Sequence, residues 1–379
     1  MALSFYNHQR LYQRDKAEID AAIARVIASG RFDWGDEVPA FERAFAEWNG
    51  ASHAVAVASG TAALKVALLA LGIGPGDEVI TVANTDIGSS SSIHHAGATP
   101  VWVDIDPTSR NMDVHALRHA ITPRTRAILA VDLYGHPADM KAIMAVADQH
   151  GLFVVEDACL ALGATIDGSK LGKLAHVTCF SFAPSKHLGS FGSGGAALTE
   201  DGDLAERMRK ISAYGQERSR HYAMHGAGMG GLHHETHGLN ERLAEMQAAI
   251  LCAKLQHLAG TIAERRAQAL RYAEGMSSFG IDLPQTLPGC EHSWRNYVIE
   301  ADDRAGLASR LRERGIPTNL TYAPPLHLQP VFADRGLERG ALPVTERFCD
   351  RLLGLPIGPQ LTMDEIDQVI DAVRQATAA

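Results

Sequence analysis

The sequence CFSFAPSKHLGSFGSGGAALT spans residues 179–199 and carries Lys186 near its centre. An apolar run leads into this stretch and another closes it, which predicts two strands joined by a glycine-bounded turn. A lysine held in that turn among Phe182, Pro184 and Phe191 would be partly desolvated. Desolvation lowers the pKa of an amine and makes it a better nucleophile toward a carbonyl group. The stretch therefore indicates a lysine that forms a Schiff base, although a surface lysine in a hairpin turn has the same pattern.

The composition is that of an ordinary globular chain. Its 379 residues are 46% hydrophobic and 21% charged, a length that suits roughly two domains. The formal net charge is -9 and the basic residues form no block, which argues against a nucleic-acid partner. The five cysteines are odd in number and far apart, so we expect reduced thiols. The N-terminal residues lack an apolar signal and no stretch reads as a membrane span, so we expect a cytoplasmic protein without a membrane partner.

Short apolar runs alternate with helical segments along the first two thirds of the chain. Strands are expected at residues 55–58, 77–83, 99–105, 126–135, 152–158, 177–182 and 195–198. Helices are expected at residues 14–29, 38–48, 62–71, 112–120, 139–150 and 203–213. This alternation predicts an α/β fold with a mainly parallel sheet flanked by helices. Ligands of such sheets bind beyond the carboxyl ends of the strands.

The first strand is followed by Ser59, Gly60 and Thr61, and then by an apolar helix. A strand, a small polar turn and a helix together point free backbone N–H groups and the positive end of the helix dipole toward an anion. These three residues are therefore candidates for a phosphate site. Serine and threonine also favour helix N-termini for capping alone, and this motif by itself does not decide between the two readings.

The strand at residues 152–158 ends in Glu156 and Asp157. Because it ends at the edge where ligands bind, we expect at least one of the two carboxylates to face the crevice. The alternative is that Asp157 caps the turn that follows, a common role for an aspartate leaving a strand.

The region after the helix at residues 203–213 is rich in glycine and histidine. The spacing G-x-G-x-x-G occurs at Gly226, Gly228 and Gly231, but no apolar strand precedes it, so a dinucleotide site is not expected. Three histidines, His233, His234 and His237, lack the spacing of a metal site and a nearby cysteine. We expect a solvated or substrate-facing loop and no metal.

The C-terminal third predicts a smaller α+β domain. A long helical pair at residues 240–258 and 264–276 leads into it, and segments at 294–301, 305–315, 318–323 and 363–376 follow. We expect a large α/β domain with an N-terminal helical arm at residues 1–250 and a small domain at residues 251–379.

One cofactor requires all the features found so far. Pyridoxal 5'-phosphate (PLP) needs a lysine for its aldehyde, a carboxylate at its pyridine nitrogen and donors for its phosphate. Lys186, Asp157 and the turn at residues 59–61 supply these groups in the order expected for one sheet.

At this point the chain resembles the DegT-type (StrS-like) PLP-dependent sugar aminotransferases of fold type I. The resemblance runs nearly end to end through the blocks FERAFAEWNGASHAVAVASGTAALKVALLALGIGPGDEVITV, GATPVWVDID, VDLYGHPADM, VVEDA, SFAPSKHLGSFGSGG, GLNERLAEMQAAIL, PPLHLQP and LPIGPQLT. It implies a fold-type I architecture with a smaller C-terminal α+β domain.

The resemblance also implies roles for single residues. Lys186 would form the internal aldimine, Asp157 would pair with the pyridinium nitrogen, and Gly60, Thr61 and Ser181 would bind the phosphate. Asn240, in GLNER, would reach the cofactor of a neighbouring subunit, which implies a homodimer with shared active sites. The substrate-side candidates are His327, in PPLHLQ, together with His187 and Tyr322.

Three positions depart from the family pattern. Leu160 stands where a glutamine usually packs near the ring, and Asp86 stands where an aromatic residue usually stacks on it, if the block aligns without a gap. Ser193 replaces an acidic residue before the paired glycines. The cofactor neighbours Leu160 and Asp86 could mark a specialised natural-product enzyme.

The expected reaction is a ping-pong transfer of an amino group from L-glutamate or L-glutamine to a ketone of a sugar, nucleotide sugar or cyclitol. The turn HLGSFGSGG looks most like that of family members acting on 3-keto sugars. A branch of the family that eliminates a hydroxyl carries histidine in place of the lysine, and here the position is Lys186. The alternatives are a PLP-dependent elimination or dehydration, and a non-catalytic PLP-binding regulatory homologue.

Overall fold

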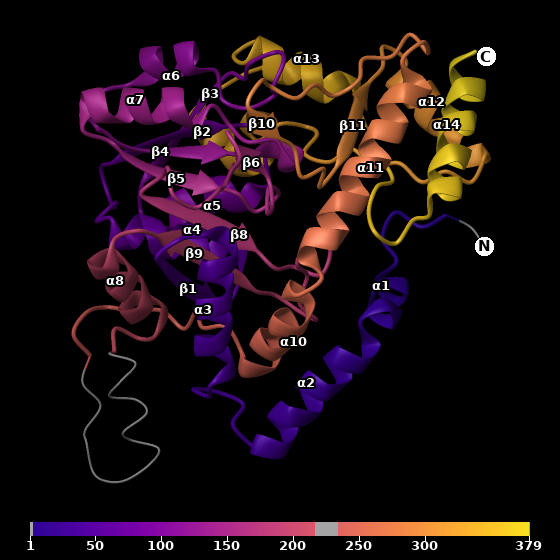
Figure 1. Cartoon of the computed structure of the whole chain (residues 1–379). Coiled ribbons are helices and arrows are strands. Elements are labelled where there is room, and N and C mark those ends of the chain that lie inside the picture. The colour runs from indigo at the N-terminus through magenta and orange to yellow at the C-terminus, as the bar shows by residue number, and fades with distance from the viewer. Residues whose placement is uncertain (1–2, 217–233, 379) are drawn as a thin grey trace.

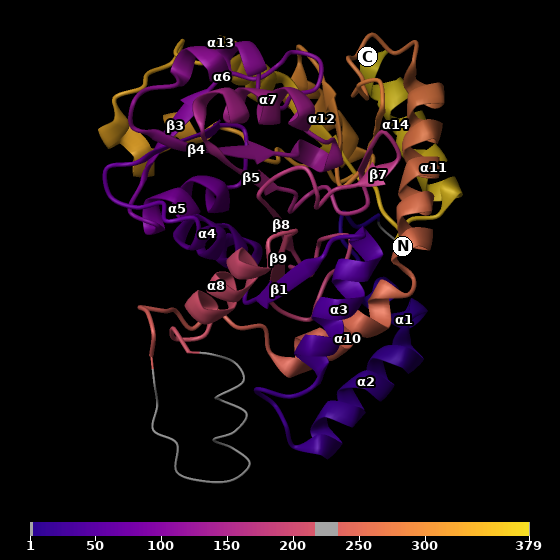
Figure 2. The same ribbon diagram turned by 60° about the vertical axis from the view of Figure 1, so that its left-hand side comes forward.

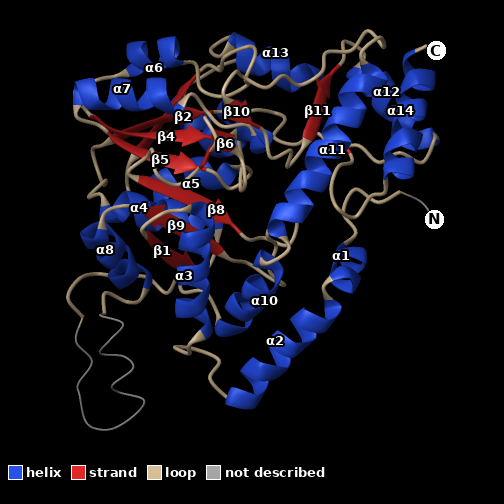
Figure 3. Cartoon of the chain, viewed as in Figure 1, coloured by secondary structure: helices blue, strands red, loops and turns tan. Residues whose placement is uncertain are grey.

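The computed structural model describes residues 3–216 and 234–378 and centres on a seven-stranded sheet of order β1-β9-β8-β5-β4-β2-β3 (Figure 3). All neighbours pair in parallel except β9, which runs antiparallel to both β1 and β8. The mainly parallel α/β sheet expected from the sequence is confirmed. Its strands are β1 (His53–Val57), β2 (Glu78–Val82), β3 (Thr99–Val103), β4 (Thr125–Val131), β5 (Phe153–Asp157), β8 (Val177–Ser181) and β9 (Gly195–Thr199).

Helices cover both faces of this sheet, because its strands are apolar on both sides. Figures 1 and 2 place α4 and α5 on one side, and α6 and α7 on the other. The helix α4 consists mostly of alanine and leucine and packs against β1, β5, β8 and β9. The helices of this domain are α4 (Gly60–Ala70), α5 (Ile87–His95), α6 (Val114–Ala120), α7 (Met140–His150) and α8 (Gly202–Ser212), with the 3-10 turn η1 (Leu133–Gly135).

The N-terminal helices α1 (His8–Arg14) and α2 (Lys16–Ser29) lie beside the body of the molecule, and α3 (Glu37–Asn49) packs on β1 (Figure 1). The apolar residue Ile27 of α2 is 58% exposed. The buried stripe of α2 is narrow: Ala22 and Val26 pack against α10. A helix that contacts mainly one neighbour buries fewer positions than its apolar pattern offers.

The C-terminal part forms a second hydrophobic core around the antiparallel pair of β11 and β12. Its elements are α10 (Glu245–Leu255), α11 (Leu258–Met276), β11 (Tyr297–Glu300), α12 (Arg304–Glu313), η2 (Leu326–Leu328), η3 (Pro330–Arg335), α13 (Pro343–Arg351), β12 (Leu352–Leu355) and α14 (Met363–Thr377). A small three-stranded sheet joins β6 (Thr165–Ile166), β7 (Ser169–Lys170) and β10 (Cys290–Glu291).

The helix expected from residue 240 begins only at Glu245. The preceding backbone is extended, because Asn240 bridges to Ala213 and Arg242 bridges to Val57. The sequence of residues 240–244 has helical composition, but pairing with distant segments overrides local propensity here.

The long helix α11 belongs to both cores. Its first half contributes Leu258 and Ile262 to the core of the large sheet, and its second half contributes Ala269, Tyr272 and Met276 to the second core. We therefore propose the division into residues 1–250 and 251–379, with α11 joining the two domains.

Within residues 3–216 and 234–378, no helix has the length and apolar character needed to cross a bilayer. The glycine motif at Gly226, Gly228 and Gly231, and His233, lie outside the described residues.

Candidate active site

The parallel strands of the large sheet all end at one edge, and the predicted site residues follow these ends. Ser59 follows β1, Asp86 follows β2, Asp157 ends β5, and Ser181 ends β8. The antiparallel strand β9 starts at the same edge, where Gly195 pairs with both Val57 and Ser181. The sheet topology therefore gathers residues that are more than a hundred positions apart in the chain.

Lys186 lies in the turn between β8 and β9. Backbone hydrogen bonds close this turn, from Lys186 N to Ala183 O at 2.8 Å and from Phe182 N to Gly194 O at 2.7 Å. Burial lowers the pKa of Lys186, and the positive charge of Arg295 lowers the pKa further, while Asp157 and Asp86 act in the opposite direction. The sequence expectation of a desolvated lysine thus agrees with its surroundings.

The expected contribution of Phe191 to that desolvation was wrong. Phe182 is fully buried, but Phe191 is 47% exposed and packs against Tyr12 with a ring separation of 5.9 Å. Its side chain also lies over the amine of Lys254 rather than being drawn into the turn around Lys186. The sequence gives composition but not the direction of a side chain in a turn.

Asp157 is buried and held in place through both of its carboxylate oxygens. Ser89 Oγ donates to Oδ2 at 2.7 Å, and the Cys159 N–H donates to Oδ1 at 3.2 Å. Burial raises the pKa of Asp157, and these hydrogen bonds and the charge of Lys186 oppose that rise. The alternative expectation, that Asp157 caps the next turn, therefore holds for Oδ1 alone. The carboxylate also interacts with the charge of Lys186.

Glu156 points to the opposite face of the sheet, because successive side chains of a strand alternate. Thr178 Oγ1 donates to its Oε2 at 2.6 Å, while Oε1 has no partner. Burial raises the pKa of Glu156 to about 7, while the hydrogen bond from Thr178 and the neighbouring Asp132 carboxyl group act against this rise. Of the two adjacent carboxylates, Asp157 is the one at the site.

The turn before α4 packs directly on the end of β8. A Cβ atom on Gly60 would lie 2.7 Å from Ser181 Cβ and 2.8 Å from Cys159 Sγ, so only glycine allows this approach. Ser59 Oγ accepts from the Ala62 N–H at 3.0 Å, as in a capped helix. The first N–H groups of a helix have no intrahelical acceptor. The Ser59 side chain caps the Ala62 N–H, and the N–H groups of Gly60 and Thr61 have no acceptor within the helix.

Asp86 caps α5 through the Gly88 N–H at 2.8 Å, and it is exposed at the mouth of this edge. A Cβ atom on Gly88 would meet Thr61 Oγ1 at 2.7 Å, so the starts of α4 and α5 touch. Leu160, three residues after Asp157, is buried in the main hydrophobic core. Asp86 is thus an acidic group near Lys186, and Leu160 is a residue of the hydrophobic core.

Two residues of the C-terminal part reach the same place. Tyr322 has a left-handed backbone, with φ of 72°, and stacks on Tyr134 with a ring separation of 6.1 Å. Burial raises its pKa, and the charges of Asp86, Arg295 and Asp157 act on it as well. Arg295 was missed by sequence reasoning, because it stands in WRNYVIEA as an ordinary strand-flanking arginine and carries no local signal of a site.

His187 connects the lysine turn to the C-terminal part. Its Nε2 lies 3.0 Å from Ser293 O, and burial holds its pKa well below the usual range, so the ring is neutral and donates this bond. His327 is buried and bonds through Nε2 to Glu346 Oε1 at 3.0 Å. The neighbouring Leu326 N–H donates to Ala83 O at 2.8 Å, which fixes this segment at the end of β2.

Asn240 lies apart from this group in the single chain. It is exposed and bridges to Ala213, on the side of the large domain where α8 lies. The structure thus places Leu160 in the hydrophobic core and leaves Asn240 outside the group. It brings together Ser59, Gly60, Thr61, Asp86, Asp157, Ser181, Lys186, His187 and Tyr322, with His327 next to them.

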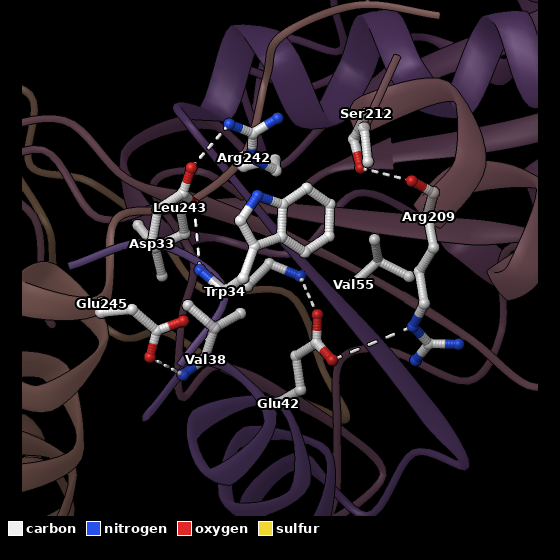
Figure 4. A pocket seen from close by; sticks show the side chains of 12 residues that line it. Asp33, Trp34, Val38, Glu42, Val55, Arg209, Ser212, Arg242, Leu243 and Glu245 are labelled. Atoms are coloured by element: carbon white, nitrogen blue, oxygen red, sulfur yellow. Dashed lines mark hydrogen bonds and ion pairs between the residues drawn. The ribbon is translucent and has the colours of Figure 1, made fainter. Parts of the chain in front are cut away.

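A separate small cavity of about 30 Å³ lies between α3, β1 and the start of α10 (Figure 4). Its charged groups pair with one another, Arg242 with Asp33 at 2.8 Å and Arg209 with Glu42 at 3.9 Å, and Glu42 also accepts from the Ala56 N–H at 2.9 Å. It has room for little more than a water molecule. These contacts hold residues 240–245 against the neighbouring segments of the large domain. Among the described residues, no group of three or more His, Cys, Asp or Glu side chains is arranged to hold a metal ion.

Comparison with known proteins places this arrangement in a family. The model of the DegT/DnrJ/EryC1/StrS aminotransferase family matches residues 13–374. Over 372 residues the chain is 45% identical to the dTDP-3-amino-3,4,6-trideoxy-alpha-D-glucose transaminase of Streptomyces venezuelae, covering 98% of this chain and 95% of that protein.

Solved structures give the same result and confirm the expected fold. The chain matches S. venezuelae DesV, solved in complex with a ketimine intermediate, with a TM-score of 0.94 and 44% identity over 100% of this chain and 99% of that one. It also matches ntda from Bacillus subtilis with bound cofactor PMP, with a TM-score of 0.90 and 31% identity over 100% and 86% of the two chains. The chain therefore belongs to the DegT/DnrJ/EryC1/StrS aminotransferase family.

Proposed function

We propose that this aminotransferase uses PLP to move an amino group from L-glutamate or L-glutamine to a ketone on a nucleotide-linked sugar. The observation that carries the proposal is the desolvated amine of Lys186 beside the buried carboxylate of Asp157, at the edge where α4 begins. Membership of an aminotransferase family and the PMP-bound relative support the choice of cofactor.

The residues present fit that cofactor. Lys186 offers an amine for its aldehyde, Asp157 offers a carboxylate for its ring nitrogen, and the N–H groups of Gly60 and Thr61 offer an anion site for its phosphate. Ser181, whose Cβ packs against Gly60, is proposed to contribute its hydroxyl to that anion site. When bound, PLP supplies an electron sink for the bond that breaks at Cα of the donor.

The side chains of the protein perform the remaining tasks. Because burial lowers the pKa of Lys186, its amine gives up a proton more readily than an exposed lysine, as a general acid and base at Cα must do. The hydrogen bonds from Ser89 and Cys159 favour the ionised form of Asp157, which a protonated ring nitrogen needs as its partner. Tyr322, which lies near Asp157 and Asp86, is proposed to shield the site from water, and Leu160 is the proposed apolar neighbour of the cofactor ring.

The proposed acceptor is a 3-keto sugar carried by a nucleotide. Two observations support it: the name of the S. venezuelae relative describes a 3-amino sugar linked to dTDP, and the turn after Lys186 has the form that suggested 3-keto substrates. His187, His327 and Tyr322 are the residues proposed to face the substrate.

We further propose a cytoplasmic homodimer in which Asn240 of each subunit approaches the cofactor phosphate of the other. The exposed position of Asn240, away from Lys186 in its own chain, supports this arrangement. Sedimentation should give a dimer. When Asn240→Ala subunits are mixed with Lys186→Ala subunits, each hybrid dimer has one site in which both residues are intact, so the mixture should be more active than the average of the two variants. A monomer with full activity would contradict the proposal.

The direct test incubates the PLP-loaded protein with L-glutamate and a dTDP-linked 3-keto sugar and identifies the product by mass spectrometry. We expect an amino sugar and 2-oxoglutarate in equal amounts, and the same sugar with L-glutamine as donor if glutamine serves. Loss of a hydroxyl group without gain of nitrogen would support elimination instead. No reaction with either donor, with cofactor bound, would favour a regulatory role.

A further inference from the structure

Arg295 is a buried arginine without a carboxylate partner. It is 4% exposed, and its Nε has no hydrogen-bond partner. One Nη lies 3.3 Å from the Tyr6 hydroxyl, and the guanidinium lies 5.2 Å from the centre of the Tyr6 ring. Among the described residues it forms no ion pair. A buried cation without a counter-ion is costly unless an anion arrives to compensate it.

The backbone around Arg295 is held firmly. Trp294 has a left-handed φ of 55°, and its ring stacks on His292 with a centroid separation of 3.8 Å and parallel planes. Ser293 N donates to Gly135 O at 2.9 Å, and Asn296 N donates to Tyr134 O at 3.1 Å. Strained backbone that its surroundings hold in place often positions a functional side chain. The guanidinium is thus presented by a rigid segment rather than a mobile one.

This segment docks at Lys186. His187, the next residue, donates to Ser293 O at 3.0 Å. The charge of Arg295 lowers the pKa of Lys186 and also acts on Tyr322 across the site. The guanidinium therefore lies beside the space bounded by Lys186 and Tyr322.

A second buried arginine shows what a structural role looks like here. Arg265, on α11, donates through Nη1 to Trp294 O at 3.1 Å and to Ile357 O at 3.3 Å. It holds α11 to two segments of the C-terminal part through their backbone carbonyls. Arg295 makes no such set of bonds, so its donors stay available for a ligand.

We propose that Arg295 binds the α-carboxylate of the amino donor. This inference rests on the proposed function, since it names the group that recognises the donor at the same site. Proton transfer requires Cα of the donor to lie next to Lys186 Nζ, and the α-carboxylate is one bond away from that atom. A planar guanidinium matches a carboxylate with two parallel N–H donors. L-Glutamate and L-glutamine share this carboxylate, so one arginine serves both.

The other anion at this site is the cofactor phosphate, but it has its own donors at the start of α4 and at Ser181. If Arg295 served the phosphate instead, its loss would weaken cofactor binding. The experiment below separates the two.

The test compares wild type, Arg295→Gln and Arg295→Lys, all loaded with PLP, with Arg271→Gln as the matched control. Arg271 is an exposed arginine of α11 that pairs with Asp367. Binding of 2-oxoglutarate, the keto acid of the donor, is measured by calorimetry. Loss of a buried charged pair lowers affinity by ~30-fold or more, so Arg295→Gln should show at least that loss. Arg295→Lys should lose less, and Arg271→Gln should match wild type.

Donor kinetics supply the second readout. The kcat/KM for L-glutamate should fall by a similar factor in Arg295→Gln, while 4-aminobutyrate, which lacks the α-carboxylate, should react equally poorly with both proteins. Unchanged 2-oxoglutarate binding, or a loss of cofactor affinity with normal donor discrimination, would overturn the assignment. A wild type that reacts with neither donor would overturn the proposed function instead, and Arg295-dependent binding of 2-oxoglutarate would still identify the carboxylate site.

Discussion

Two regions of the molecule build the candidate site in different ways. At the edge of the large sheet, Ser59, Asp157 and Lys186 follow strand ends and occupy positions that the parallel topology creates. On the other side, Arg295 and Tyr322 come from irregular segments whose left-handed residues lie at φ of 55° (Trp294) and 72° (Tyr322). The first region is set by sheet topology, and the second is set by contacts with distant parts of the chain.

The comparison suggests a division of labour. In the proposed function, the sheet edge would carry the groups for the cofactor, which every reaction of this kind needs, and a rigid sheet would hold them precisely. The irregular segments would carry the groups that meet the substrates, where a change in one loop can change specificity without disturbing the sheet. Substitutions in the first region should therefore lower every activity, and those in the second should act on one substrate.

Among substitutions that test this comparison, Asp157→Asn is expected to have the largest effect on activity. A neutral amide cannot keep the ring nitrogen of PLP protonated, so the turnover number should fall by ~10²–10³-fold with either donor, as expected when a buried charged pair is broken. Steady-state kinetics with saturating donor and acceptor checks this.

Ser89→Ala is the milder companion of that variant. It removes a hydrogen bond that lowers the pKa of Asp157. The acid limb of the pH–rate profile should therefore move to higher pH.

An Asp157→Asn protein with wild-type turnover would contradict the role proposed for the sheet edge.

Gly60→Ala should have the next largest effect. A methyl group there would lie 2.7 Å from Ser181 Cβ, which forces the turn before α4 away from β8. We expect cofactor affinity to fall by ~10- to 100-fold, because the phosphate donors move apart. Equilibrium dialysis of PLP measures the change. Gly74→Ala, at a glycine whose nearest neighbour is 3.9 Å from such a methyl, is the control and should bind like wild type.

In the second region, Trp294→Gly tests how Arg295 is positioned. Glycine tolerates the left-handed backbone but removes the stack on His292 and lets the segment move. The KM for L-glutamate should rise by ~10-fold, with cofactor affinity and the KM for the keto sugar unchanged. An equal rise in both KM values would break the proposed division between the regions.

The smallest effect on activity is expected for Glu156→Gln. Glu156 is next to Asp157 in the chain, but its side chain points to the opposite face of the sheet. The pKa of Glu156 is raised from 4.5 to about 7, so its contribution to stability is fully present below pH 4.5 and is lost as pH rises through 7. Glutamine does not ionise, so the variant does not lose this stability as the pH rises. Relative to wild type, the variant should gain about 1–3 kcal/mol of unfolding free energy between pH 4.5 and pH 8.

Urea unfolding at the two pH values measures this difference, and activity at neutral pH should stay within about twofold. A constant difference between the proteins at both pH values would show that Glu156 does not titrate in this range.

Much of the sheet edge could be predicted from the sequence, because its signals are local. A strand that ends in Asp157, a small polar turn before an apolar helix, and Lys186 in a glycine-bounded turn each lie within a few residues. The alternation of strands and helices then predicts that they meet. The same locality explains the errors: the direction of Phe191 and the start of α10 depend on neighbours far away in the chain.

The second region could not be predicted from the residues alone. Arg295 reaches Lys186 through the contact of His187 with Ser293 and through a backbone turn at Trp294, and neither leaves a pattern in the sequence. The helix α13 and strand β12 were also missed, because a helix that runs directly into a strand carries no turn signal between them.

The most direct test of the account is the absorption spectrum of the PLP-loaded protein, wild type against Lys186→Ala, before and after L-glutamate is added. We predict a visible band that requires Lys186 and that glutamate converts to the near-ultraviolet band of the pyridoxamine form. A cofactor band that is the same with and without Lys186, or one that neither L-glutamate nor L-glutamine changes, would contradict the central claim.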